Sequence, residues 1–277
     1  MATARTVAMW AAIAAALTAS PALSEGTGAA DWMARSAATR AAGDIEARLT
    51  FTTSRPGEAP RRLVYVMFWK PYPAGSKYTS KAIFFSEEPA TAKGFAYMGW
   101  FQTTGGEEAW LYIPELRTVR RMTQPHRHTH GHGTAETDPF DASVLRRTEL
   151  EMRASALGGH QTTGTEVVSG QLAEVIDSVP TDAESPYAKV RTWVSRSDAL
   201  PLLTRYLRPD GTWKEVAFTW RQVDGVWVWD RVAARDTRSG DATTLEMGDV
   251  RVNAGLPDRF FSERTMQDGL KRFRQRP

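Results

Sequence analysis

The sequence predicts a mainly β protein with a few helices, built as one large, curved antiparallel sheet. Three observations support this. Strand-length runs with a hydrophobic period of two fill most of the chain, turn residues recur between them at regular intervals, and few segments have helical spacing. About ten to twelve strands are expected, and a twisted sheet of that size must curl or close. We therefore expect an incomplete barrel around or beneath helices, with the helices against one side.

The elements of the first half follow from local pattern. Residues 31–42 (DWMARSAATRAA) place Trp32, Met33 and Ala37 at helical spacing, and Gly43 follows as a natural stop. The next strand-length runs are IEARLTFTT, RRLVYVMFW, SKAIFFSE and GFAYMGWF, separated by connections that contain Pro, Gly or Ser. The run AWLYIP then leads through a proline into a basic segment, RTVRRM.

An insertion at about residues 123–163 interrupts the strands. It begins with the His-rich QPHRHTHGHG and continues with DASVLRRTELEMR, which allows a short helix. Strands then resume, and the Asp-Gly pairs in RPDGTW and VDGVW predict tight hairpins. A last helix is expected after Ser262, a good N-cap, and runs through Met266, Leu270 and Phe273. No break in composition divides residues 25–277, so we expect one domain.

The first 24 residues predict a cleaved secretory signal. Arg5 precedes an apolar run from Val7 to Leu17, and the small residues Ala22 and Ser24 provide a cleavage point. A run of about 11 residues is too short to cross a bilayer, which needs roughly 20. The chain has no cysteine, so neither disulfides nor an N-terminal lipidated cysteine are available to it. We expect a soluble periplasmic protein.

Several strands are apolar on both faces, which needs explanation. An antiparallel sheet usually shows one face to water, so such strands require cover on both sides or a ligand on one. Either the aromatic rings pack beneath helices, or they line a cavity for a lipophilic ligand. The candidate lipid-binding residues are Phe68, Phe84, Trp100, Trp110, Tyr112 and Trp220.

The motifs KAIFFSEEPATAKGFAYMGW, AWLYIPELRTVRRM, YAKVRTWVSRSDALPLLTRYLRPDGTWKEVAFTW and VNAGLPDRFFSERTM occur in one order along the chain. Together they resemble the outer-membrane lipoprotein-sorting protein-like family, related to the periplasmic carrier LolA. The resemblance implies an incomplete barrel wrapped round helices that holds an acyl chain or another lipophile. It also implies an inner-membrane exporter of the RND type as donor and an outer-membrane acceptor. The chain departs from the family where residues 126–140 replace its usual Phe-Met-Gly-Ser-Asp-Phe type of motif. At the rim of the cavity, Arg117, Arg120 and Arg121 are expected to meet anionic headgroups or an acidic partner surface.

Other chemistry has less support. The tract HRHTHGH places four imidazoles at alternate positions, which suits zinc, nickel or copper, although flexible His-rich tracts bind these ions opportunistically. Its residues are His126, His128, His130 and His132. No catalytic fingerprint appears, so we expect no enzyme and no cofactor, and a net charge of +3 without a basic stripe argues against nucleic acid. The alternatives to a carrier are a sensor or adaptor that binds protein segments in the same groove, and a metal-binding protein.

Overall fold

A computed structural model describes residues 28–39, 43–104, 106–122, 144–145, 150, 157–181 and 185–270. The expected signal sequence, the four histidines of the His-rich tract and most of the expected helix near residue 150 lie outside the described residues.

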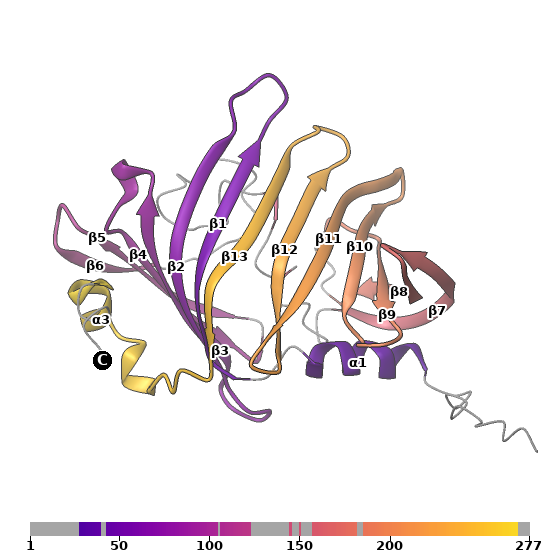
Figure 1. Cartoon of the computed structure of the whole chain (residues 1–277), viewed down its shortest axis with the longest axis horizontal. Helices are drawn as coiled ribbons and strands as arrows, with labels where there is room; N and C mark the ends of the chain where they lie inside the picture. Colours follow the sequence, from indigo (N-terminus) through magenta and orange to yellow (C-terminus); the bar gives the residue numbers. More distant parts are fainter. Residues whose placement is uncertain are drawn as a thin grey trace, which may run out of the picture.

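The described chain forms one 13-stranded antiparallel sheet in the order β6-β5-β4-β3-β2-β1-β13-β12-β11-β10-β9-β8-β7 (Figure 1). The mainly β fold is confirmed. The sheet is curved but open, because β6 and β7 are its two edges, so it is no closed barrel. The strands are β1 (Ile45–Ser54), β2 (Arg61–Pro71), β3 (Tyr78–Glu88), β4 (Ala96–Gln102), β5 (Glu107–Ile113), β6 (Thr118–Met122), β7 (Leu157–Val168), β8 (Gln171–Pro180), β9 (Lys189–Ser195), β10 (Pro201–Arg208), β11 (Gly211–Val223), β12 (Val226–Asp236) and β13 (Ala242–Val252).

The hairpin between β11 and β12 shows how turn residues set the register. Asp224 and Gly225 have φ angles of 48° and 78° and join Val223 directly to its partner Val226. Positive φ at both central positions is the backbone of the two-residue turn whose twist matches that of the sheet. The hairpin predicted from the Asp-Gly pair is confirmed.

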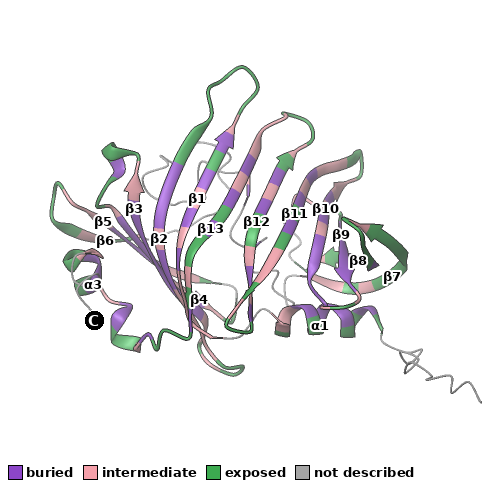
Figure 2. Cartoon of the chain, viewed as in Figure 1, coloured by how far each residue is buried: buried purple, intermediate pink, exposed green. Residues whose placement is uncertain are grey.

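Strand β7 was not expected from the sequence. It begins at Leu157, within the range expected for the insertion, and almost all of its residues are exposed or half-buried (Figure 2). An edge strand with little burial on either face needs no alternating apolar residues. Its sequence, LGGHQTTGTEVV, has β-branched residues but no period-two alternation of apolar residues.

Two α-helices lie in the described part of the chain: α1 (Ala29–Thr39) and α3 (Glu263–Asp268), with short 3-10 turns η1 (Ala90–Ala92) and η3 (Asp258–Phe260). Ser262 caps α3 as predicted, since its side chain accepts a hydrogen bond from the Thr265 N–H. Among the described residues, no helix is long and apolar enough to cross a membrane.

The two helices pack on opposite faces of the sheet, not against one side as expected. Trp32 and Met33 of α1 join the core cluster that contains Phe51 of β1, whereas Met266 of α3 joins the cluster that contains Phe68 of β2. Successive residues of a strand point to opposite faces. In β3, Phe84 belongs to the first cluster and Phe85 to the second. We call the two sides of the sheet the α1 face and the α3 face.

Candidate functional site

The α1 face carries the larger of these two apolar clusters, and short segments cover it. Its side chains come from strands β1 to β5 and β8 to β13, and they pack against Trp32 and Met33 of α1. Leu145 and Leu150, two described residues of the long segment between β6 and β7, are also members and are 0% and 2% exposed. Among the described residues, this face is therefore covered by one helix and by parts of a connecting segment.

Two hydrogen bonds hold Val144 against the sheet. Its backbone N–H donates to Oγ1 of Thr243 on β13 over 3.0 Å, and its carbonyl oxygen accepts from Nζ of Lys214 on β11 over 2.9 Å. Lys214 is only 4% exposed, and its ammonium lies 5.5 Å from the centre of the Tyr206 ring. Burying an ammonium costs free energy unless it is hydrogen-bonded, so this contact both satisfies Lys214 and fixes the segment.

The α3 face is covered by the C-terminal segment. Phe68, Ile83, Phe85, Met98 and Trp110 of β2 to β5 pack there against residues that follow β13. The covering residues are Leu256, Phe260, Phe261 and Met266.

Asp258 anchors that segment to the sheet. Its carboxylate accepts hydrogen bonds from Nζ of Lys70 over 3.0 Å and from the hydroxyl of Tyr72 over 2.9 Å. Nζ of Lys81, on a side chain that is 9% exposed, lies 3.6 Å from the same carboxylate and 4.3 Å from the centre of the Trp100 ring. Burial and the bond to Asp258 raise the pKa of Tyr72, so its hydroxyl stays a donor.

The six candidate lipid-binding residues do not line one surface. Phe84 and Trp220 belong to or pack against the α1-face cluster. The other four belong to or pack against the α3-face cluster, which the C-terminal segment covers: Phe68, Trp100, Trp110 and Tyr112. Period-two patterns identify residues that share a face, but they do not say which element covers that face.

The arginines of the motif AWLYIPELRTVRRM are divided in the same way. Arg121 pairs with Trp110 across β5 and β6, lies 5.7 Å from its ring centre, and forms a 2.9 Å ion pair with Glu108. Arg120 pairs with Leu111, so it lies on the other face of the same edge strand. Arg117 lies in the turn before β6 with a φ of 50°.

Lys214 and the charged group on β8 and β9 were not predicted from the sequence. In WKEVAF, Lys214 shares a face of the strand with Val216 and Phe218, which are apolar. A lysine among apolar residues of one face could have marked a buried, hydrogen-bonded ammonium. On β8, Asp177 accepts hydrogen bonds from Arg191 over 2.6 Å and from Lys189 over 2.9 Å, which hold the pKa of this carboxyl below its usual value.

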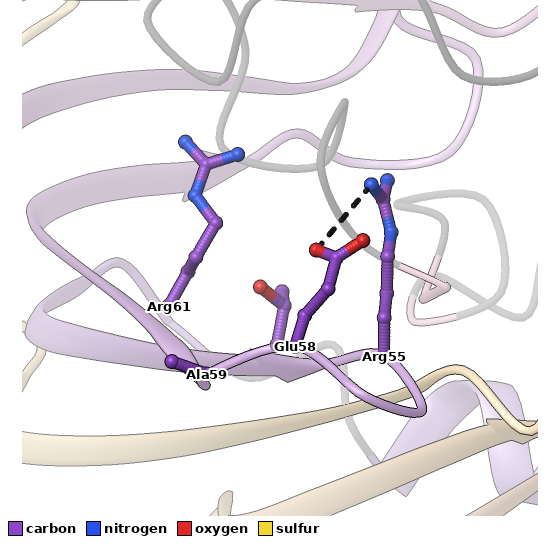
Figure 3. Close-up of a pocket in the computed structure, with 5 residues that line it drawn as sticks. Arg55, Glu58, Ala59 and Arg61 are labelled. Atoms are coloured by element: carbon purple, nitrogen blue, oxygen red, sulfur yellow. Dashed lines mark ion pairs between the residues drawn. The ribbon is translucent and has the colours of Figure 1, made fainter.

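Neither a metal centre nor a large pocket defines a second site in the described part of the chain. No group of three or more His, Asp or Glu residues that could hold a metal ion occurs among the described residues. The pocket in Figure 3 lies at the β1–β2 hairpin and has room of about 10 Å³, enough for about one water molecule. It is lined by Thr53, Arg55, Glu58, Ala59 and Arg61.

The open, curved sheet with a helix on each face has a LolA-like fold, as comparison with solved structures shows. A DUF1329 family protein from Desulfovibrio piger has a TM-score of 0.69 and 18% identity over 86% of this chain and 97% of its own. A domain from Vibrio parahaemolyticus, named for outer membrane lipoprotein sorting, has a TM-score of 0.68 and 19% identity over 87% of this chain and 98% of its own. A LolA superfamily protein from Nitrosomonas europaea has a TM-score of 0.61 and 18% identity over 87% of this chain and 100% of its own.

A family model with the description "Uncharacterized protein" matches residues 78–268, and the chain belongs to that family. The fold of the chain is LolA-like, which confirms the resemblance inferred from the sequence. None of the curated proteins matches the chain significantly.

Proposed function

We propose that this protein is a periplasmic carrier that binds a lipid or another lipophilic cargo on the α1 face. The observation that carries the proposal is the cover of that face: within the described residues, a large apolar surface is closed by α1 and by Leu145 and Leu150, not by a second sheet. Short segments can move away from a sheet without disrupting its hydrogen-bonded ladder. The likeness to proteins named for lipoprotein sorting supports the same function.

The burial of a long acyl chain can offset the free energy lost when Leu145 and Leu150 leave the α1 face. Exposing two buried leucine side chains costs roughly 3–6 kcal/mol, while each methylene of an acyl chain gains about 0.8 kcal/mol on burial. An acyl chain that buries about eight methylenes or more therefore offsets the exposure of Leu145 and Leu150. We infer that the cargo is long-chained, and that Phe84 and Trp220 contact it.

The other candidate residues take supporting roles in this proposal. Trp110 and its neighbours on the α3 face stiffen the sheet from behind. Arg117 and Arg120, at the β6 edge, meet anionic headgroups or an acidic partner, while Arg121 is engaged by Glu108. The relay runs between membranes or from an RND-type exporter, as the family resemblance implies, and the first 24 residues direct export.

A reversible disulfide tests the proposal, because the chain has no cysteine of its own. Val144 and Thr243 are in hydrogen-bond contact, so V144C/T243C should lock the segment closed when oxidised. We expect the oxidised variant to bind a fluorescent fatty-acid probe at least about tenfold more weakly than its reduced form. The single variants V144C and T243C should bind alike with and without reductant. Equal probe binding by the locked and reduced forms would show that cargo does not enter beneath this segment.

A further inference from the structure

Two buried threonines lie side by side on the α1 face, and the described part of the chain offers their hydroxyls no hydrogen-bond partner. Thr192 of β9 and Thr204 of β10 are directly paired across the two strands. They are 0% and 1% exposed, and neither Oγ1 has a hydrogen-bond partner among the described residues.

The surroundings of this threonine pair are apolar. Thr192 also pairs with Ile176 of β8, and Thr204 also pairs with Val216 of β11. Both partners belong to the α1-face cluster, as does Tyr206, two residues beyond Thr204. Burial of a threonine hydroxyl here costs the free energy of its desolvation, and no hydrogen bond with a described group offsets that cost. Valine has nearly the same shape and would not carry the cost.

Two other buried hydroxyls on the sheet, those of Thr243 and Ser178, are satisfied by the chain itself, whereas that of Ser86 on β3 also has no partner among the described residues. Oγ1 of Thr243 accepts the Val144 N–H, and Oγ of Ser178 lies 2.8 Å from Nδ1 of His160. The threonine pair differs from these, because two adjacent hydroxyls point into an apolar cluster with no described group to bond.

We propose that Thr192 and Thr204 bind a neutral hydrogen-bonding group of the cargo, an ester carbonyl or a hydroxyl. This inference rests on the proposed function, in which cargo lies on the α1 face. A threonine hydroxyl both donates and accepts, so the pair can bond either group. A charged group would lose its hydration among apolar side chains, and the ammonium of buried Lys214, which pairs with Tyr206 across the strands, is engaged by the Val144 carbonyl.

The position of the pair fits a cargo that displaces the covering segment. Tyr206 of β10 pairs with Lys214 of β11, which holds Val144. Thr204 lies two residues from Tyr206, and adjacent strands are about 4.8 Å apart. Thr204 also pairs with Val216, two residues along β11 from Lys214, so a chain that displaces Val144 there has only two residues of strand to cross before it reaches the hydroxyls. The cargo class is thus an ester- or alcohol-bearing lipid and not a plain hydrocarbon.

The test compares three probes of similar length: radiolabelled methyl palmitate, hexadecanol and hexadecane, with bound label measured after gel filtration. We expect T192V/T204V to bind methyl palmitate and hexadecanol about tenfold more weakly than wild type and to bind hexadecane equally well. Thr50→Val is the matched control, because Thr50 of β1 lies on the α3 face; it should leave all three affinities unchanged.

Stability separates a ligand-binding role from a structural one. If the hydroxyls serve the cargo, T192V/T204V should unfold within about 2 °C of wild type or above it. A loss of more than about 4 °C would mean that the hydroxyls stabilise the fold, and would overturn the inference. Unchanged binding of methyl palmitate and hexadecanol by the double variant would overturn it as well, while leaving the carrier function intact. Failure of the wild type to bind any of the three probes would instead refute the proposed function.

Discussion

Replacing Asp258 with asparagine should loosen the C-terminal segment from the α3 face. Asparagine keeps the size of the side chain and an acceptor oxygen for Lys70 and Tyr72, but it removes the charge. The change therefore isolates the electrostatic part of the anchor.

The magnitude follows from how differently the partners are buried. The Lys81 side chain is 9% exposed, so its ammonium has given up most of its hydration, and Asp258 is the carboxylate that compensates it over 3.6 Å. Removing one partner of a fully buried pair costs about 3–5 kcal/mol. The Asp258 side chain is 59% exposed, so solvent screens it and the pair contributes less. We expect a loss of about 2 kcal/mol, which for a domain of this size lowers the melting temperature by about 4–8 °C.

Thermal unfolding at several pH values provides the assay. The hydrogen bond from Lys70, together with Tyr72 and the charge of Lys81, holds the pKa of Asp258 below its usual value. A lowered carboxyl pKa stabilises the fold fully above the ordinary value of about 3.9, and this stabilisation is lost as pH falls through the lowered pKa. The difference between wild type and variant should therefore be constant from pH 7 to 5 and shrink as the pH falls below the ordinary carboxyl pKa of about 3.9.

Asp249→Asn is the control for this experiment. Asp249 is an exposed residue of β13 with a φ of 47°, which asparagine tolerates. It should unfold within about 0.5 kcal/mol of wild type. If Asp258→Asn were as stable as this control at pH 7, the anchor would contribute nothing, and the C-terminal segment would be held by its apolar residues alone.

Three further predictions test the cap, the half-buried His160 and the core. Ser262→Ala should cost about 0.5–1 kcal/mol in thermal unfolding, because the N-cap of α3 is lost; no change would mean that α3 is fixed by packing. Burial lowers the pKa of His160, so the unfolded chain binds its proton more tightly than the folded chain does. Acidification from pH 7 to 5 should therefore destabilise wild type, and His160→Gln should reduce this pH dependence of the unfolding free energy. An unaltered pH dependence in the variant would contradict the assigned burial. Phe51→Ala should cost about 3–5 kcal/mol by chemical denaturation, against less than about 0.5 kcal/mol for exposed Thr52→Ala, and similar losses would place Phe51 outside the core.

The sequence predicts the strands that carry their own signal. In β1, Leu49 and Phe51 alternate with polar residues, and the pattern of burial alternates with them. The turn at Asp224 and Gly225 and the cap at Ser262 were equally readable, because each depends on neighbours in the chain.

The division of the candidate lipid-binding residues between the two faces of the sheet depends on tertiary packing, which local sequence patterns do not predict. Trp110 and Leu111 are both apolar neighbours in β5, and nothing local says that Trp110 faces the residues around Phe260. That contact joins segments about 150 residues apart, and it depends on where Asp258 anchors the chain. Similarly, the hydrogen-bond acceptor of Lys214 is the backbone carbonyl of Val144, and a pattern of side chains cannot predict a backbone partner.

Native mass spectrometry of the protein purified from its own host tests the carrier function most directly. We expect a bound species that organic solvent extracts and that is identified as a long-chain lipid with an ester or hydroxyl group. We also expect V144C/T243C, oxidised during export, to be recovered without that species. Recovery of wild type as the bare polypeptide, together with no binding of a fluorescent fatty-acid probe, would contradict the proposed carrier function.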